Sequence, residues 1–163
     1  LFEFLENEKN QKNILDLNHE DLIKIIKKSV STKSDIVSLD EKENGIRAIL
    51  NYGHSFGHVI ENLCGYGEYL HGEAISVGMR IAGDIASDIG VWSIEDSQRQ
   101  NKLIKDFGLP IKIPSLKKES ILKILMGDKK VKEGKMRFVL PTKIGNVEIF
   151  NNIEEKNFIN YFN

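Results

Sequence analysis

The sequence predicts a mainly α-helical bundle that carries one small β-hairpin. Apolar residues recur at the helical period over most of the 163 residues. Glycine-containing breaks at 65–67, at Gly90 and at 108–110 separate these periodic stretches. Two short runs with strand composition occur only near the carboxyl end, at 136–140 and 147–150.

The amino-terminal part is expected to hold two helices around a polar loop. Residues 1–8 resemble the end of a helix, and 10–18 are expected to form a loop. Asn18 is a candidate N-cap with acidic residues behind it, and the apolar spacing that follows predicts a helix over 19–37. A charged loop is expected at 40–45.

The same apolar period predicts five more helices, over 46–63, 71–90, 95–107, 118–126 and 153–162. The two strands are expected to be joined across Pro141 and Gly145. Gly53 and Gly57 would each cost about 1 kcal/mol inside a helix relative to alanine. Their presence indicates that something approaches this backbone closely.

Composition describes an ordinary globular chain and excludes several classes of function. Hydrophobic residues make up 40% and charged residues 29%, and the net charge is −1. Neither nucleic acid nor a membrane surface is an expected partner. The single Cys64 excludes an internal disulfide framework and indicates a reducing compartment, so we expect a cytoplasmic protein. We expect one domain over 1–163, cut from a longer protein, because the chain begins without methionine inside an amphipathic pattern.

Three of the four histidines lie within eighteen residues and point to a metal site. His54 and His58 are four residues apart, which places both rings on one face of a helix. His71 follows the glycine break, where the chain can turn back. Neutral imidazole is a common ligand for divalent metals. Spacing alone favours His54 and His58 as two ligands with His71 as the third, and it leaves three carboxylates open: Glu61, Glu68 and Glu73.

A polar stripe is expected beside the histidines. Arg47, Asn51 and the two histidines of the pair follow at spacings of four, three and four, and Lys33 and Glu43 can converge on them. Arginine suits capture of a carboxylate or phosphate. A stripe of this kind indicates the wall of a cleft, whereas the cluster 128–130 is a weaker signal that also fits a solvated loop.

The residues of the histidine cluster and the polar stripe resemble a known family, 3-dehydroquinate synthase. The resemblance rests on a long central motif and on shorter ones after it: Glu43-x-Gly-x-Arg47-x-x-x-Asn51-x-Gly-His54-x-x-Gly-His58-x-x-Glu61, Gly65-Tyr66-Gly67, Leu70-His71-Gly72-Glu73-Ala74, Asp128-Lys129-Lys130 and Arg137-Phe138-Val139-Leu140-Pro141. It implies a mainly helical carboxy-terminal domain that binds metal and substrate, preceded in the intact enzyme by an NAD-binding α/β domain.

The resemblance also implies roles for individual residues. The metal, Zn²⁺ or Co²⁺, would be held by His54 and His71, not by the i,i+4 pair, and by a glutamate upstream of this chain. His58 would contact substrate and transfer protons, and Glu43 would be a second acid or base. Four further positions match substrate contacts, the last of them at one of two adjacent lysines: Lys33, Arg47, Asn51 and Lys129 or Lys130.

The implied reaction is that of a carbon–oxygen lyase of the shikimate pathway, which leads to chorismate and aromatic amino acids. The enzyme would convert 3-deoxy-arabino-heptulosonate 7-phosphate, a phosphorylated keto acid, to 3-dehydroquinate and phosphate with NAD and a divalent metal. Homodimers are implied as well. No residue of this chain is expected to bind NAD, and the chain alone is expected to be inactive.

Two other interpretations remain open from the sequence. The chain could belong to another sugar-phosphate cyclase or to an iron-type polyol dehydrogenase, although Arg47 and Asn51 favour a substrate with a carboxylate. It could also be a helical interaction module that keeps the motif without using it.

Overall fold

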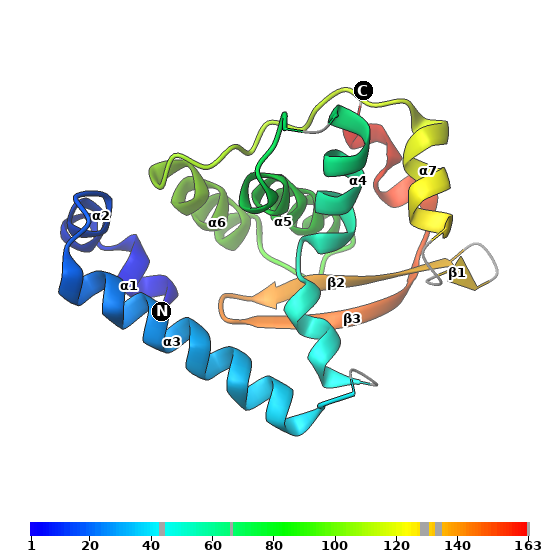
Figure 1. Cartoon of the computed structure of the whole chain (residues 1–163). Coiled ribbons are helices and arrows are strands. Elements are labelled where there is room, and N and C mark those ends of the chain that lie inside the picture. The colour runs from blue at the N-terminus through cyan, green and yellow to red at the C-terminus, as the bar shows by residue number, and fades with distance from the viewer. Residues whose placement is uncertain (43–44, 66, 128–130, 133–134, 163) are drawn as a thin grey trace. The chain divides into compact units, whose positions relative to one another are not determined.

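The computed structural model describes residues 1–42, 45–65, 67–127, 131–132 and 135–162. They form two compact units, Leu1–Leu50 and Asn51–Asn163. The elements are mostly helices, with one small antiparallel sheet (Figure 1). The predicted fold class is confirmed.

The described part of the first unit contains three α-helices, α1 Phe2–Glu6, α2 Glu8–Leu15 and α3 His19–Leu39. The Asn18 side chain accepts hydrogen bonds from two backbone amides of the first turn of α3, so the predicted cap is confirmed. The loop predicted at 10–18 is wrong over most of its length. A second cap explains the error, because the Asn7 side chain accepts from two backbone amides and starts α2 inside a polar stretch.

The second unit contains the remaining α-helices and the sheet. The helices are α4 His54–Cys64, α5 His71–Asp88, α6 Ile94–Asp106 and α7 Lys118–Gly127. The strands are β1 Val131–Lys132, β2 Lys135–Lys143 and β3 Asn146–Ile153, in the order β1-β2-β3. Helices α4 and α5 lie side by side, and β2 and β3 form a long hairpin (Figure 1). No helix within the described residues has the length and apolar character needed to cross a bilayer.

The single helix predicted over 46–63 is wrong. A 3₁₀ helix, η1 Ile46–Asn51, ends first, and α4 begins only at His54. Gly53 between them has a φ of 80°, a left-handed conformation that an α-helix cannot contain. The chain therefore changes direction immediately before the first histidine.

The hairpin was predicted, but its turn is displaced. Pro141 lies inside β2, opposite Val147, and the turn falls at Gly145, whose φ is 84°. The register shifts between Pro141 and Lys143, next to the residue that cannot donate a ladder hydrogen bond. The short strand β1 extends the hairpin to three strands.

The predicted terminal helix over 153–162 is also wrong. Ile153 ends β3, and two 3₁₀ helices follow, η2 Glu155–Asn157 and η3 Ile159–Phe162. The apolar residues of this segment are still buried, since Phe158 and Phe162 are each 1% exposed. The apolar spacing correctly predicted which residues are buried, but it did not distinguish a 3₁₀ helix from an α-helix.

Aromatic rings join the sheet to helix α4. The Phe56 ring stacks on Phe138 of β2 with centroids 4.8 Å apart, and it meets the Phe158 ring edge-on at 5.4 Å. All three side chains are nearly inaccessible to solvent. Burial of such rings supplies much of the stability of a small core, so α4, which carries two of the histidines, has a rigid support.

A half-buried carboxylate on α5, Asp84, makes the stability of the fold depend on pH. Burial raises the pKa of Asp84 above its usual value, and Arg80, with Nε 3.1 Å from the carboxylate, offsets this only in part. The folded chain then binds more protons than the unfolded chain, so the contribution of Asp84 to stability falls as the pH rises past about 4.

The variant Asp84→Asn is therefore expected to raise the free energy of unfolding at pH 7. The gain should vanish below about pH 4, where the native carboxyl is protonated in both states. Urea unfolding at a series of pH values measures both. A loss of stability at pH 7 that persists in acid would contradict the expected sign.

Candidate metal and substrate site

The histidines are positioned by an unusually close contact between α4 and α5. A β-carbon at Gly78 would lie 2.0 Å from the carbonyl oxygen of Gly53 and 2.8 Å from the amide nitrogen of Gly57. A β-carbon at Gly57 would lie 2.6 Å from Cδ1 of Ile75. Glycine at these positions lets the two backbones touch. The sequence expectation that something approaches the backbone at Gly53 and Gly57 is confirmed.

The structure brings three imidazoles together beside the contact between α4 and α5. His54 is the first residue of α4, His58 lies one turn later, and His71 is the first residue of α5. The ring centroids of His54 and His71 are 5.6 Å apart, those of His54 and His58 5.8 Å, and those of His58 and His71 6.3 Å. The chain turns back between the helices at Gly65 and Gly67, both with positive φ, as the sequence indicated.

These distances fit a shared divalent metal ion. Two imidazoles bound to one tetrahedral zinc through bonds of about 2.1 Å have centroids about 5 Å apart. The His54–His71 and His54–His58 pairs are both close to that spacing. Within the described residues, however, no group of three His, Cys, Asp or Glu side chains is arranged to hold a metal ion. The imidazoles therefore fit part of a metal site, and spacing alone does not decide which pair binds.

The rings of His54 and His71 each have an oxygen atom within hydrogen-bonding distance of Nδ1. Nδ1 of His71 lies 2.9 Å from Oε1 of Glu61, and Nδ1 of His54 lies 3.2 Å from the carbonyl oxygen of Tyr52. Tyr52 is itself fixed, because its hydroxyl donates a hydrogen bond of 2.5 Å to Oε1 of Gln100 on α6. Burial raises the pKa of Tyr52 above its usual range, so this hydroxyl stays protonated.

Glu73, another carboxylate that the sequence left as a possible ligand, makes a structural hydrogen bond. Oε2 of Glu73 accepts a hydrogen bond of 2.8 Å from the backbone amide of Leu70 and closes the first turn of α5. Capping of this kind satisfies one of the free amides of a helix N-terminus. Glu73 therefore has a structural function that explains its presence beside His71.

The residues expected to bind substrate are only partly described. Lys33 and Arg47 lie in the first unit, where Nη1 of Arg47 donates a hydrogen bond of 2.6 Å to the carbonyl oxygen of Glu41. Asn51 and the three clustered histidines lie in the second unit. The stripe does not follow one helix, because the chain turns at Gly53, and its convergence stays a prediction. Three expected site residues lie outside the described residues: Glu43, Lys129 and Lys130.

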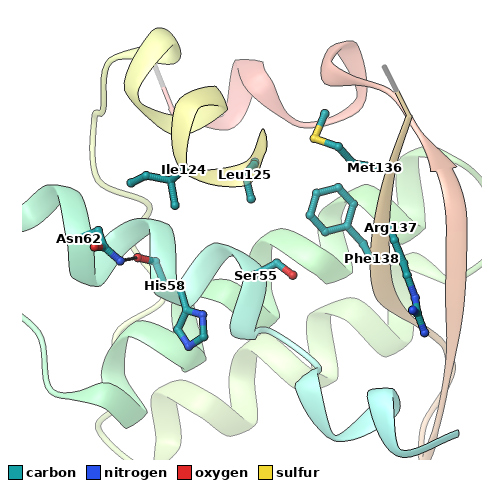
Figure 2. Close-up of a pocket in the computed structure, with 8 residues that line it drawn as sticks. All are labelled: Ser55, His58, Asn62, Ile124, Leu125, Met136, Arg137 and Phe138. Atoms are coloured by element: carbon teal, nitrogen blue, oxygen red, sulfur yellow. Dashed lines mark hydrogen bonds between the residues drawn. The ribbon is translucent and has the colours of Figure 1, made fainter. Parts of the chain in front are cut away.

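A cavity of about 180 Å³ adjoins His58. Figure 2 shows His58 and Asn62 on α4, with α7 and β2 on the other sides of the cavity. The amide of Asn62 donates a hydrogen bond of 2.7 Å to the carbonyl oxygen of His58 and fixes this turn. The lining is mixed apolar and polar: Ser55, His58, Asn62, Ile124, Leu125, Met136, Arg137 and Phe138.

The sequence did not assign Arg137 or Ser55 to this cavity. Arg137 was quoted only as part of a strand motif, and it alternates with the buried Met136 and Phe138. That alternation marked it as the exposed residue between two core residues. Ser55 lies between two histidine positions of the motif but carries no spacing signal of its own. Tertiary packing of α7 on α4 was needed to find both.

Comparison with known proteins decides the family. The model of the carboxy-terminal region of 3-dehydroquinate synthases matches residues 1–131. The chain belongs to the 3-dehydroquinate synthase family. Among curated members of this family, the 3-dehydroquinate synthase of Prochlorococcus marinus subsp. pastoris (strain CCMP1986 / NIES-2087 / MED4) is 69% identical over 163 residues. That of Prochlorococcus marinus strain NATL2A is 53% identical over 156 residues.

The alignments cover less than half of these relatives. The chain aligns over its whole length with 45% of the first and over 96% of its length with 42% of the second. The family assignment therefore applies to this portion, whereas the activity of a whole enzyme does not follow from it directly.

Solved structures share the fold. The 2-epi-5-epi-valiolone synthase of Streptomyces hygroscopicus subsp. jinggangensis 5008, with NAD⁺ and Zn²⁺ bound, matches 98% of the chain and 44% of its own with a TM-score of 0.83 at 20% identity. A 2-deoxy-scyllo-inosose synthase complexed with carbaglucose-6-phosphate, NAD⁺ and Co²⁺ matches 82% of the chain and 39% of its own, with a TM-score of 0.71 at 27% identity.

Proposed function

We propose that this chain supplies the metal- and substrate-binding part of a 3-dehydroquinate synthase. The proposal is supported most by one observation: in a chain of this family, the rings of His54 and His71 meet 5.6 Å apart beside His58. The substrate would be 3-deoxy-arabino-heptulosonate 7-phosphate and the products 3-dehydroquinate and phosphate, which belong to aromatic amino acid biosynthesis.

His54 and His71 are proposed to hold the metal together with a carboxylate from outside the 163 residues. When bound, a divalent ion such as Zn²⁺ or Co²⁺ polarises a substrate hydroxyl and favours its oxidation. NAD would serve as the hydride carrier and would be held by a separate part of the enzyme. The sequence of this chain has no glycine-rich nucleotide motif, so none of its residues is assigned to NAD.

The remaining site residues are proposed to orient the substrate and move its protons. Arg47 and Lys33 would anchor the carboxylate, and Asn51 would bind hydroxyls, so that the reacting carbons keep their position through several steps. His58, on α4 one turn after His54, would transfer protons at the substrate. Glu43 would be a second acid or base, and Lys129 or Lys130 a further anion contact.

A related cyclase is the second candidate, because the solved structures with this fold are sugar-phosphate cyclase relatives. The two candidate functions differ in whether the substrate carries a carboxylate. Arginine matches a carboxylate with two parallel hydrogen bonds, and we propose that Arg47 uses this geometry. An enzyme that accepts a phosphorylated sugar without a carboxylate equally well would contradict that choice.

A chimeric enzyme tests the proposed function. The aligned segment of the Prochlorococcus marinus MED4 enzyme is replaced by this chain, whose 69% identity should preserve internal contacts. The chimera should release phosphate from 3-deoxy-arabino-heptulosonate 7-phosphate only with NAD and a divalent metal. The isolated chain should release none. A folded chimera that retains metal but releases no phosphate from this substrate would refute the proposal.

We further propose a cytoplasmic homodimer. The single cysteine fits a reducing compartment, and the homodimer follows from the family resemblance. Sedimentation of the chimera should give twice the mass of one chain, and a monomer at micromolar concentration would contradict the dimer.

A further inference from the structure

The hydrogen bonds of two histidines indicate which ring nitrogen of each remains available to a metal ion. Nδ1 of His71 lies 2.9 Å from a Glu61 carboxylate oxygen, and Nδ1 of His54 lies 3.2 Å from the Tyr52 carbonyl oxygen. A carboxylate and a backbone carbonyl only accept hydrogen bonds, so each Nδ1 carries the hydrogen and donates it. In a neutral imidazole, the lone pair is then on Nε2.

We propose that Glu61 is a positioning residue for the metal centre. It holds the ring of His71 so that Nε2 is the ligating atom, as the Tyr52 carbonyl does for His54. Glu61 then acts from outside the coordination sphere and is not a ligand itself. The inference rests on the proposed function, because it takes His54 and His71 as the metal ligands.

Burial explains why the glutamate fixes the histidine and not the reverse. The Glu61 side chain is 28% exposed and stands on α4, whereas the His71 side chain is 59% exposed at the first residue of α5. An exposed ring at a helix end has few packing contacts to hold it. A carboxylate on the neighbouring helix supplies the missing restraint and makes the imidazole a stronger ligand.

Two of the three carboxylates that the sequence left as possible ligands have other contacts in the structure. Glu61 is engaged by the His71 ring, and Glu73 caps α5. Glu68 is exposed, in the break between the helices. Glu68 is the matched control, because it carries the same carboxylate and its side chain makes no hydrogen bond or ion pair to the three rings within the described residues.

The test measures zinc affinity in the chimera described above, by competition with a chromophoric chelator. Removal of an outer-sphere partner of a metal-bound histidine typically weakens binding about 10–100-fold. Glu61→Gln is expected near the lower end of that range and Glu61→Ala near the upper end. Glu68→Gln should bind zinc as the parent does. The absorption spectrum of the Co²⁺ form should keep the parent's coordination number in both Glu61 variants.

Each outcome has a definite meaning. Parent-like zinc affinity in both Glu61 variants overturns the inference, as does a Co²⁺ spectrum that shows a lost ligand, since Glu61 would then bind the ion itself. If His54→Ala and His71→Ala keep parent-like zinc affinity, the proposed function fails at its metal site, whatever Glu61 does. Thus the two failures are distinguishable.

A second measurement does not depend on any variant. Long-range ¹H–¹⁵N correlation spectra of the zinc-free chain report which ring nitrogen carries the hydrogen. His54 and His71 should both be protonated at Nδ1. Protonation at Nε2 of a neutral His71 ring would overturn the inference.

Discussion

Alanine at His54 or at His71 is expected to abolish retention of the metal by the chimera and, with it, phosphate release. Each variant removes one of two imidazoles whose centroids lie 5.6 Å apart. Loss of an outer-sphere partner alone costs about 10–100-fold in affinity, so loss of a ligand should cost more than that. Metal content after gel filtration in buffer with a weak chelator, together with a phosphate-release assay, measures both effects.

Two other histidines give the controls. His19, the fourth histidine, is exposed at the start of α3, and His19→Ala should keep the parent's metal content and rate. His58→Ala separates the two arrangements that the ring distances permit. It should retain metal and lose phosphate release, because His58 is proposed to transfer protons and not to bind the metal. Loss of metal in His58→Ala with retention in His71→Ala would mean that the i,i+4 pair is the ligand pair.

Alanine at Gly78 is expected to destabilise the fold by about 3 kcal/mol or more, at or above the usual range for overpacking. The new β-carbon would lie 2.0 Å from the Gly53 carbonyl oxygen and 2.8 Å from the Gly57 amide nitrogen. Both are backbone atoms, so no side chain can rotate away. Relief requires α4 and α5 to separate, which would also move His54 away from His71.

Gly72 on the same helix is the matched control. A β-carbon there meets nothing within 4 Å, so Gly72→Ala should be neutral or stabilise by up to about 1 kcal/mol through helix propensity. Urea unfolding of both variants gives the comparison. If Gly78→Ala unfolds at the parent's denaturant midpoint, the backbones of α4 and α5 do not touch at Gly78.

Local signals in the sequence predicted much of the helical architecture. Asn18 before an apolar repeat placed the start of α3 correctly, and the glycines at 65–67 marked the turn that returns His71 to His54. These features depend on a cap or a backbone conformation set by neighbouring residues. Such signals can be read directly from the chain.

The errors arose where tertiary packing decides the conformation. Gly53 was predicted to lie within a helix, but it has a left-handed φ and its backbone lies against Ile75 and Met79 of α5, where a β-carbon would not fit. The segment after Ile153 has a helical apolar pattern but folds as 3₁₀ turns against the core. Spacing alone could not choose among the histidines, because all three rings meet.

The position of the bound ion is the most direct test of the proposed metal site. Crystals of the zinc-loaded chimera, measured at the zinc absorption edge, would locate the ion by anomalous scattering. We expect one ion about 2.1 Å from Nε2 of His54 and Nε2 of His71, with the Glu61 carboxylate accepting a hydrogen bond from Nδ1 of His71. An ion bound by His54 and His58, or bound directly by Glu61, would contradict it.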